Sequence, residues 1–210
     1  MTRVLIADDH EVVRRGLKDI LEDALGKFKL WEARTAQEAI ELVMNQPFDL
    51  VLLDINMPGR SGLEVLEEIK HLRPKTPVLM LSVAPEEDYA VRCLKLGAAG
   101  YLSKRSASEE LVTAVTKAMA GGRYVTPAVA EKLAAALSGK PCDAPHGALS
   151  NRELEVLKLI AAGKTIKEIA CELLLSAKTI ATYRARLSEK MGLTTNVELA
   201  RYAIQHHLTE

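Results

Sequence analysis

The first 120 residues alternate between short apolar runs and segments in which apolar residues recur every three or four residues. The segments VVRRGLKDILEDAL and QEAIELVM have the 3.6-residue period of amphipathic helices. Strands that alternate with helices predict an α/β domain with a five-stranded, doubly wound parallel sheet covered on both faces. The apolar runs are VLIA (4–7), LWEA (30–33), LVLLDI (50–55), VLMLSV (78–83) and GYLSK (100–104).

Polar residues mark where helices are expected to begin. A Ser or Thr followed three residues later by Glu predicts a capping box, in which each side chain accepts a hydrogen bond from the other residue's N–H. From Leu149 onward no strand pattern occurs, and the caps there predict four short helices in about 60 residues. The boxes are Thr35/Glu38, Ser61/Glu64, Ser106/Glu109, Ser150/Glu153, Thr165/Glu168 and Thr195/Glu198, and Ser176 is a further N-cap candidate.

The pattern changes again between these two regions. After Gly121 and Gly122, TPAVAEKLAAAL predicts one more helix, and SGKPCDAPHGA is rich in Pro, Gly and Ser and cannot form a core. We therefore expect a first domain over 1–122, a linker with one helix over 123–147 and a small all-α four-helix domain over 148–210.

Composition and charge narrow the class of protein only slightly. The chain has 210 residues, 48% of them apolar, and a formal net charge of zero. Residues 1–143 carry 19 basic and 21 acidic side chains, whereas 144–210 carry 9 and 7. An odd number of cysteines without paired short spacing, the lack of an apolar leader and the lack of a run of roughly 20 apolar residues predict a reduced, cytoplasmic protein without a membrane role.

Polar residues follow several of the predicted strands. In a parallel sheet the carboxyl ends of the strands meet at one edge, where ligands bind. Carboxylates about 4 Å apart would repel by roughly 4 kcal/mol per pair at an effective dielectric near 20, so such a cluster needs a cation, and Mg²⁺ suits it. Taken singly, the same aspartates could merely cap loops. The residues are Asp8, Asp9, Asp54, Ser82 and Lys104.

Asp54 is the residue that chemistry singles out in this cluster. It ends a strand that is otherwise apolar, and a carboxylate there is expensive unless it is paired or does chemistry. We expect it to act as a nucleophile that forms an aspartyl phosphate. Mg²⁺ and Lys104 would offset the charge of the transferred group, and the Ser82 hydroxyl would bond to it.

The segments VLIADDH, DLVLLDINMPGRSGLEVL, VLMLS and GAAGYLSK resemble the receiver domain of bacterial two-component response regulators, over residues 1 to about 122. The resemblance implies a flavodoxin-like fold, a sensor histidine kinase as phosphoryl donor and Asp54 as phosphoacceptor. It implies Asp8, Asp9, Asp54 and the Asn56 carbonyl as Mg²⁺ ligands, and Ser82, Tyr101 and Lys104 as switch residues. Arg105 departs from the family, in which Pro often follows the lysine.

The helical region contains two capped segments joined by a short turn. The segment after Thr165, IKEIACELL, is followed by a second helix that starts at Ser176. In a helix-turn-helix the second helix enters the DNA major groove. Residues 149–204 resemble the LuxR-type helix-turn-helix of the NarL/FixJ response regulators, which implies double-stranded DNA with inverted or tandem half-sites, and RNA polymerase, as partners.

The second of these helices has one apolar stripe and one basic side. Ile180, Leu187 and Met191 form a predicted core stripe, and Lys178, Thr182, Ala185 and Arg186 face away from it. Charge alone favours an ordinary solvated helix face over a DNA contact, because Glu172 and Glu189 dilute the patch. We assign phosphate contacts to Lys164, Lys167, Lys178, Arg184, Arg186 and Lys190, and base-edge contacts to Thr179 and Thr182; Arg184 or Arg186 could instead read a guanine.

The last helix, VELARYAIQHHL, has Leu199 and either Tyr202 or Ala203 on one side. In the family this helix pairs two DNA-binding domains, which implies a homodimer on phosphorylation through Leu199, Tyr202 and Ala203. We therefore expect a phosphorylation-dependent transcriptional regulator and not an enzyme, beyond catalysing its own phosphoryl transfer. The alternatives are a regulator independent of phosphorylation and a slow aspartyl-phosphate phosphohydrolase, which Asn56 disfavours because such hydrolases carry an Asp there.

Overall fold

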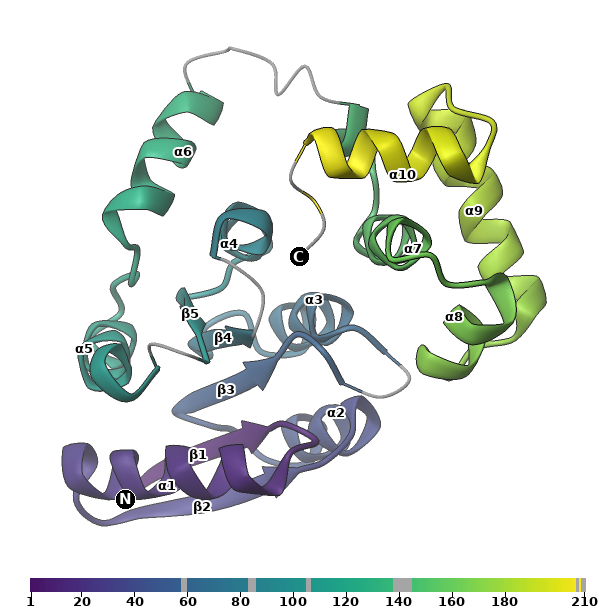
Figure 1. Cartoon of the computed structure of the whole chain (residues 1–210). Coiled ribbons are helices and arrows are strands. Elements are labelled where there is room, and N and C mark those ends of the chain that lie inside the picture. Colours follow the sequence, from purple (N-terminus) through teal and green to yellow (C-terminus); the bar gives the residue numbers. More distant parts are fainter. Residues whose placement is uncertain (58–59, 83–85, 105–106, 138–144, 207, 209–210) are drawn as a thin grey trace. The chain divides into compact units, whose positions relative to one another are not determined.

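The computed structural model describes every residue except 58–59, 83–85, 105–106, 138–144, 207 and 209–210. The chain divides into two compact units, Met1–Ala135 and Ala136–Glu210, and the boundary falls within α6 (Pro127–Leu137). The first unit is α/β and the second is all-α (Figure 1). Each unit is described by itself below.

A five-stranded, entirely parallel sheet forms the middle of the first unit, in the order β2-β1-β3-β4-β5. The two strands β3 and β4 are buried along their whole length, which explains why they read as unbroken apolar runs. This confirms the predicted sheet. The strands are β1 (Thr2–Ala7), β2 (Phe28–Ala33), β3 (Leu50–Asp54), β4 (Val78–Ser82) and β5 (Gly100–Ser103).

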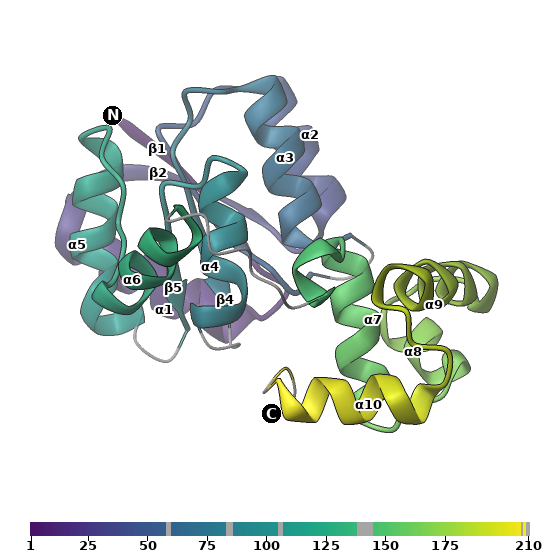
Figure 2. The same ribbon diagram turned by 90° about the horizontal axis from the view of Figure 1, so that it is seen from above.

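Helices cover both faces of this sheet, with α1 and α5 on one face and α2, α3 and α4 on the other (Figures 1 and 2). Side chains alternate between the faces along each strand. Thus Leu52 and Leu81 pack with Leu17 and Leu111 of α1 and α5. The helices are α1 (Glu11–Leu25), α2 (Ala36–Asn45), α3 (Gly62–Leu72), α4 (Glu86–Lys95) and α5 (Ala107–Met119).

The second unit contains a short 3₁₀ turn, η1 (Pro145–Ala148), and the four predicted helices. Leu154, Leu157, Ile180 and Leu187 are among the side chains buried in its core. The helices are α7 (Asn151–Ala161), α8 (Ile166–Glu172), α9 (Ala177–Met191) and α10 (Asn196–Gln205).

The capping predictions are confirmed in the second unit and only in part in the first. Reciprocal boxes form at Ser150/Glu153, Thr165/Glu168 and Thr195/Glu198, and Ser176 accepts from the Thr179 N–H. Thr35 caps α2, but Glu38 accepts from Arg34 instead. Ser61 caps α3 through the Leu63 N–H and not through Glu64. Ser106 lies outside the described residues.

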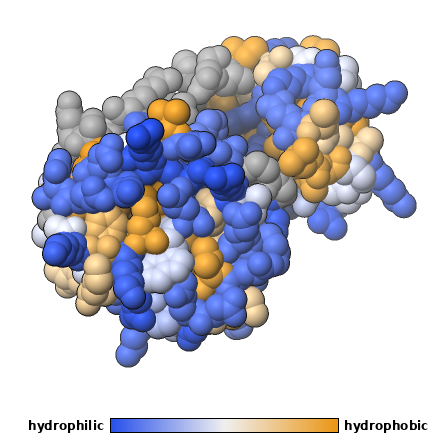
Figure 3. Space-filling model, turned by 90° about the horizontal axis from the view of Figure 1, so that it is seen from below, coloured by the Kyte–Doolittle hydropathy of each residue, from blue (hydrophilic) through white to orange (hydrophobic). Residues whose placement is uncertain are grey.

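On the face drawn in Figure 3, hydrophobic side chains are interspersed with hydrophilic ones in each unit. Val12, Leu174 and Val197 are among the few large apolar side chains that are strongly exposed. Within the described part of the chain, no helix is long and apolar enough to cross a membrane.

Candidate functional site

The carboxyl ends of β1, β3, β4 and β5 bring the predicted polar residues together. Asp8 follows β1, Asp54 and Ser82 end β3 and β4, and Lys104 follows β5. The side chains of Asp8, Asp54 and Ser82 are almost completely buried. Polar groups that are far apart in the sequence therefore share one small, nearly dry site, as the sheet topology requires.

Lys104 is the cation of this site. Its Nζ lies 2.7 Å from Asp8 Oδ2 and 2.9 Å from Asp54 Oδ2. Burial acts to lower the pKa of Lys104, but the negative charges of Asp54 and Asp8 outweigh it and raise that pKa. Lys104 is therefore firmly protonated and holds both carboxylates at the strand ends.

Asp54 remains poorly stabilised despite this ion pair. Burial raises the pKa of its carboxyl from 3.8 to about 6, against the lowering effect of Lys104. The neighbouring Asp8 raises it further. An ionised Asp54 thus costs folding free energy and gains from any cation that enters the site.

This cost predicts a pH-dependent effect of Asp54→Asn in metal-free buffer. The folded chain takes up a proton on Asp54 below about pH 6 and the unfolded chain only near 3.8, so the contribution of Asp54 to stability is lost as pH rises through this window. At pH 7 the free energy of unfolding of the variant should therefore exceed that of the wild type by up to about 3 kcal/mol. The loss of the ion pair with Lys104 reduces this difference. Urea denaturation in the presence of a chelator measures this difference in unfolding free energy, which should shrink toward pH 4. A gap that is constant across pH 4–7 would contradict it.

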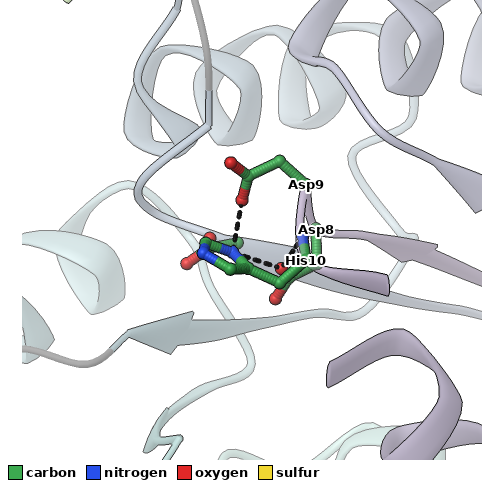
Figure 4. Close-up of side chains that lie close together, drawn as sticks. Asp8, Asp9 and His10 are labelled. Atoms are coloured by element: carbon green, nitrogen blue, oxygen red, sulfur yellow. Dashed lines mark hydrogen bonds and ion pairs between the residues drawn. The ribbon is translucent and has the colours of Figure 1, made fainter. Parts of the chain in front are cut away.

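His10 belongs to this site although its sequence pattern did not indicate it. Its Nδ1 lies 2.6 Å from Asp9 Oδ1 and 3.3 Å from Asp8 Oδ1, and its N–H donates to Asp8 Oδ1 at 2.8 Å (Figure 4). The His10 side chain is mostly exposed and precedes α1 as its N-cap residue. It therefore forms the outer wall of the acidic cluster.

Arg14 holds the backbone at Asp8 in place and is a second residue of this site that the sequence analysis did not predict. It is buried, donates from Nη1 to the Asp8 carbonyl at 2.9 Å, and contacts Glu32 Oε2 from Nε at 2.6 Å. Its spacing from Leu17 and Leu21 places it on the apolar face of α1, and an arginine on such a face is a signal that could have identified it.

The arrangement of carboxylates suits a divalent metal ion. Ligand atoms of Asp8, Asp9, His10 and Asp54 all lie within 4.8 Å of one another. The buried oxygens Asp8 Oδ2 and Asp54 Oδ1 and Oδ2 have no well-directed hydrogen bond, although Lys104 lies next to two of them. One ammonium cannot balance three carboxylates, so the remaining charge and the open oxygens fit a hard divalent cation.

Gly62, the first residue of α3, is required by the backbone around Asp54. Its N–H donates to the Ile55 carbonyl at 2.8 Å. A Cβ on Gly62 would lie 2.0 Å from the Asp54 carbonyl oxygen, far inside the van der Waals distance. The loop after β3 can therefore return this closely to the strand only because residue 62 has no side chain.

We predict that Gly62→Ala lowers the free energy of unfolding by about 2–3 kcal/mol, because the backbone at Asp54 must move to admit the methyl group. Gly16→Ala is the matched control, since Gly16 lies within α1 and a Cβ there would meet nothing within 4 Å. It should stabilise the chain by about 0.5–1 kcal/mol. Chemical denaturation of both variants tests this; equal effects would show that the contact at Asp54 carries no weight.

Two of the three predicted switch residues, Ser82 and Tyr101, lie on one face of the sheet. Tyr101 of β5 is buried and pairs with Met80 of β4, two residues before Ser82. Ser82 and Tyr101 therefore point to the same side, the side covered by α4. Asn56 is exposed beside Asp54. Arg105, where the chain departs from the family pattern, and the peptide that joins it to Lys104 lie outside the described residues.

In the second unit, α8 and α9 form the predicted helix-turn-helix. Leu174, in the turn, has a left-handed backbone with φ of 53° and is exposed. Leu175 N–H closes the turn on the Ala170 carbonyl at 2.9 Å. Along α9 the predicted stripe of Ile180, Leu187 and Met191 is buried, so the opposite side faces solvent.

The basic side chains assigned to DNA fall into two groups. Lys164 pairs with Glu172, Lys190 contacts Glu153 Oε2 at 2.7 Å, and Arg184 donates to Asn196 Oδ1 at 3.0 Å and the Thr194 carbonyl at 2.7 Å. These three cations hold elements of the unit together. The second group consists of Lys167, Lys178 and Arg186, whose side chains are exposed. None of the three forms an ion pair with another described residue.

Of the two threonines of α9, Thr182 is exposed and Thr179 is half-buried. Thr179 Oγ1 contacts Ser176 Oγ at 2.8 Å, and Thr182 Oγ1 donates to the Lys178 carbonyl at 3.0 Å. Both hydroxyls keep acceptor capacity toward solvent. Tyr183 of α9 is half-buried.

The structure disagrees with the assignment of dimer contacts to two of the three residues named on α10. Leu199 and Ala203 are fully buried, on a helix that packs against α7, and cannot contact a second chain in this conformation. Tyr202 is half-buried, with its hydroxyl 2.8 Å from His146 Nδ1 and its ring stacked on His206. The apolar period of α10 serves the unit's own core, and the exposed side chains of the helix include Val197 and Ile204.

Two segments of the chain match known families. Residues 4–116 match the response regulator receiver domain, and residues 147–203 match the bacterial regulatory proteins of the luxR family. The response regulator GacA of Pseudomonas aeruginosa is 35% identical, covering 100% of this chain and 99% of its own. The response regulator UvrY of Escherichia coli K12 is 36% identical, with 99% and 96% covered.

Solved structures give a similar result over almost the whole chain. RcsB from Salmonella enterica serovar Typhimurium, bound to the promoter rprA in the presence of the phosphomimetic BeF3⁻, is 26% identical with a TM-score of 0.67. The alignment covers 96% of this chain and 97% of RcsB. A further RcsB–DNA complex is 26% identical with a TM-score of 0.59, covering 97% and 98%.

Proposed function

Because this chain belongs to the bacterial response regulators that join a receiver domain to a LuxR-type DNA-binding domain, we propose that phosphorylation of Asp54 controls how its helix-turn-helix binds DNA. The chain is a DNA-binding transcriptional regulator of a two-component system. The observation that carries the proposal is the buried, destabilised Asp54 carboxylate held next to Lys104.

Asp54 is the nucleophile of the phosphoryl transfer. One carboxylate oxygen attacks phosphorus, the new P–O bond forms, and the bond to the donor breaks with its electron pair going to the donor. The donor is a phosphohistidine of a sensor histidine kinase or a small acyl phosphate. Lys104 stays protonated and offsets the charge of the phosphoryl oxygens.

The side chains of Asp8, Asp9 and Asp54 and the backbone carbonyl of Asn56 would hold Mg²⁺. When bound, Mg²⁺ would supply the positive charge that neutralises the carboxylates and the phosphoryl oxygens. His10 limits access from solvent, and Arg14 fixes the carbonyl of Asp8.

The phosphoryl group acts on the fold through β4 and β5. The Ser82 hydroxyl bonds to a phosphoryl oxygen, and Tyr101, on the same face, repacks between β5 and α4. A new surface on the receiver then favours a homodimer, which shifts a pre-existing equilibrium toward the DNA-binding state.

We propose that residues 1–122 form the receiver domain, 123–147 the linker and 148–210 the DNA-binding domain.

In the DNA-bound dimer, α9 of each copy enters the major groove of one half-site, and half-sites lie about one helical turn, roughly 34 Å, apart. Lys167, Lys178 and Arg186 contact phosphates, and Thr179 and Thr182 contact base edges. The similarity to RcsB, solved on the promoter rprA and in a further complex with DNA, supports DNA as the partner of this chain. The regulator acts on RNA polymerase at its promoters, in the cytoplasm where bacterial DNA lies.

Mapping protected DNA with and without acetyl phosphate and Mg²⁺ tests the proposed function. We expect protection at defined promoter sites that strengthens at least tenfold in the presence of the donor. Equal protection in both conditions would favour a regulator independent of phosphorylation. Absence of protection together with continuous release of inorganic phosphate would favour a phosphohydrolase.

A further inference from the structure

A pocket lies at the edge of the sheet opposite to Asp54. It has a volume of about 310 Å³ and is formed by the end of α3, the segments that precede β4 and β5, and the segment that follows α5. This volume is at the lower end of the range of small-molecule sites, roughly 300–1,000 Å³. The amino ends of β4 and β5 border it, so a ligand there would not meet the acidic cluster.

The charge of this pocket is one-sided. Three cationic side chains, Lys70, Lys75 and Arg123, line it, and its described lining contains no carboxylate. Lys75 and Arg123 are exposed at the rim, whereas Lys70 is half-buried. A concave site with three positive charges and no internal counter-charge attracts anions.

Lys70 is held in place and not merely solvated. Its methylene chain runs over Gly97, where a Cβ would lie 3.6 Å from Lys70 Cε. Its Nζ donates to the Thr76 carbonyl at 2.7 Å, and an ammonium has two further hydrogens to donate. Burial, and then the charge of Arg123, lower the pKa of Lys70, so an anion between the two cations would relieve an existing electrostatic cost.

Apolar groups form the remaining walls. Pro74, Pro77 and Leu96 lie around the three cations. The backbone N–H groups of Gly97, Gly121 and Gly122 already donate to carbonyls of the chain, so side chains must supply the anion contacts. Arginine binds phosphate through two parallel N–H groups and lysine binds it as a point charge.

We propose that this pocket binds a small phosphorylated organic molecule, with the phosphate between Lys70 and Arg123 and the carbon portion against Pro74, Pro77 and Leu96. The site is independent of the phosphorylation of Asp54, and would make the receiver responsive to a phosphorylated metabolite as well as to its kinase.

Titration of the full ¹⁵N-labelled chain in chelator, with phenyl phosphate, inorganic phosphate and phenol as probes, tests this proposal. Phenyl phosphate should shift the amide resonances of Gly97, Gly121 and Gly122 saturably, and bind about tenfold more tightly than inorganic phosphate because its ring is buried. Phenol should not bind measurably. If phenyl phosphate binds no more tightly than inorganic phosphate, the proposal that the ligand has an organic portion is overturned.

Variants localise the charge contacts. Lys70→Met retains the methylene packing on Gly97, and with Arg123→Gln it should weaken phenyl phosphate binding at least tenfold. Arg123→Gln alone should weaken phenyl phosphate binding severalfold. Because Arg123 is exposed, this single variant should fold normally and therefore tests the site even if the double variant misfolds. Lys29→Gln, which removes an exposed charge on β2, should bind as the wild type does. Unchanged affinity in the double variant, or shifts confined to α8 and α9, would overturn the site.

Discussion

Asp54→Asn should abolish phosphorylation of the chain by acetyl phosphate and Mg²⁺. The amide is nearly the same size as the carboxylate but has no nucleophilic oxygen, so the fold is kept and the P–O bond cannot form. Intact-protein mass spectrometry of wild type should show an added phosphoryl group, and the variant none. The donor-dependent gain in DNA protection should disappear in the same variant.

The matched control for this experiment is Asp19→Asn. It makes the same chemical change at an exposed aspartate of α1, away from the acidic cluster. It should be phosphorylated to the wild-type level. Full labelling of Asp54→Asn would place the acceptor on another residue, whereas normal labelling of wild type without any change in DNA binding would separate phosphorylation from regulation.

The second large effect is expected on DNA binding, in the double variant Lys178→Ala/Arg186→Ala. Each side chain is exposed on α9. A lost phosphate contact removes about 0.9 from the slope of log affinity against log salt, which is roughly a tenfold loss of affinity near 0.1 M salt. The double variant should therefore lose about 100-fold per protomer bound. Binding titrations at several salt concentrations, on a protected promoter fragment and on a random duplex, measure both quantities.

Arg184→Ala and Arg15→Ala provide the contrast. Arg184 lies on the same helix but holds Asn196 and Thr194 inside its own unit, so its loss should lower the stability of that unit and leave the salt slope nearly unchanged. Arg15, exposed on α1, should change neither. A slope that falls by about 0.9 in Arg184→Ala would mean that Arg184 leaves its intramolecular partners to contact phosphate.

Local sequence patterns were sufficient for the secondary structure and for much of the phosphorylation site. The apolar runs at 50–54 and 78–82 became strands because a strand buried on both faces must be apolar throughout. Asp8, Asp54 and Lys104 converge because parallel strands end at one edge, and that rule needs no coordinates. Three reciprocal capping boxes formed as predicted because their partners are neighbours along the chain, whereas Thr35 and Ser61 cap their helices without a reciprocal box.

Contacts between distant residues were decided by the tertiary structure alone. A helical period indicates that Leu199 and Ala203 share a face, but not whether that face meets α7 or a second chain. The number of basic residues near α9 is evident from the sequence, yet the pairing of Lys190 with Glu153 depends on how α7 and α9 pack. Gly62 and the pocket around Lys70 follow the same rule, since close approach and concavity arise only where separate segments meet in space.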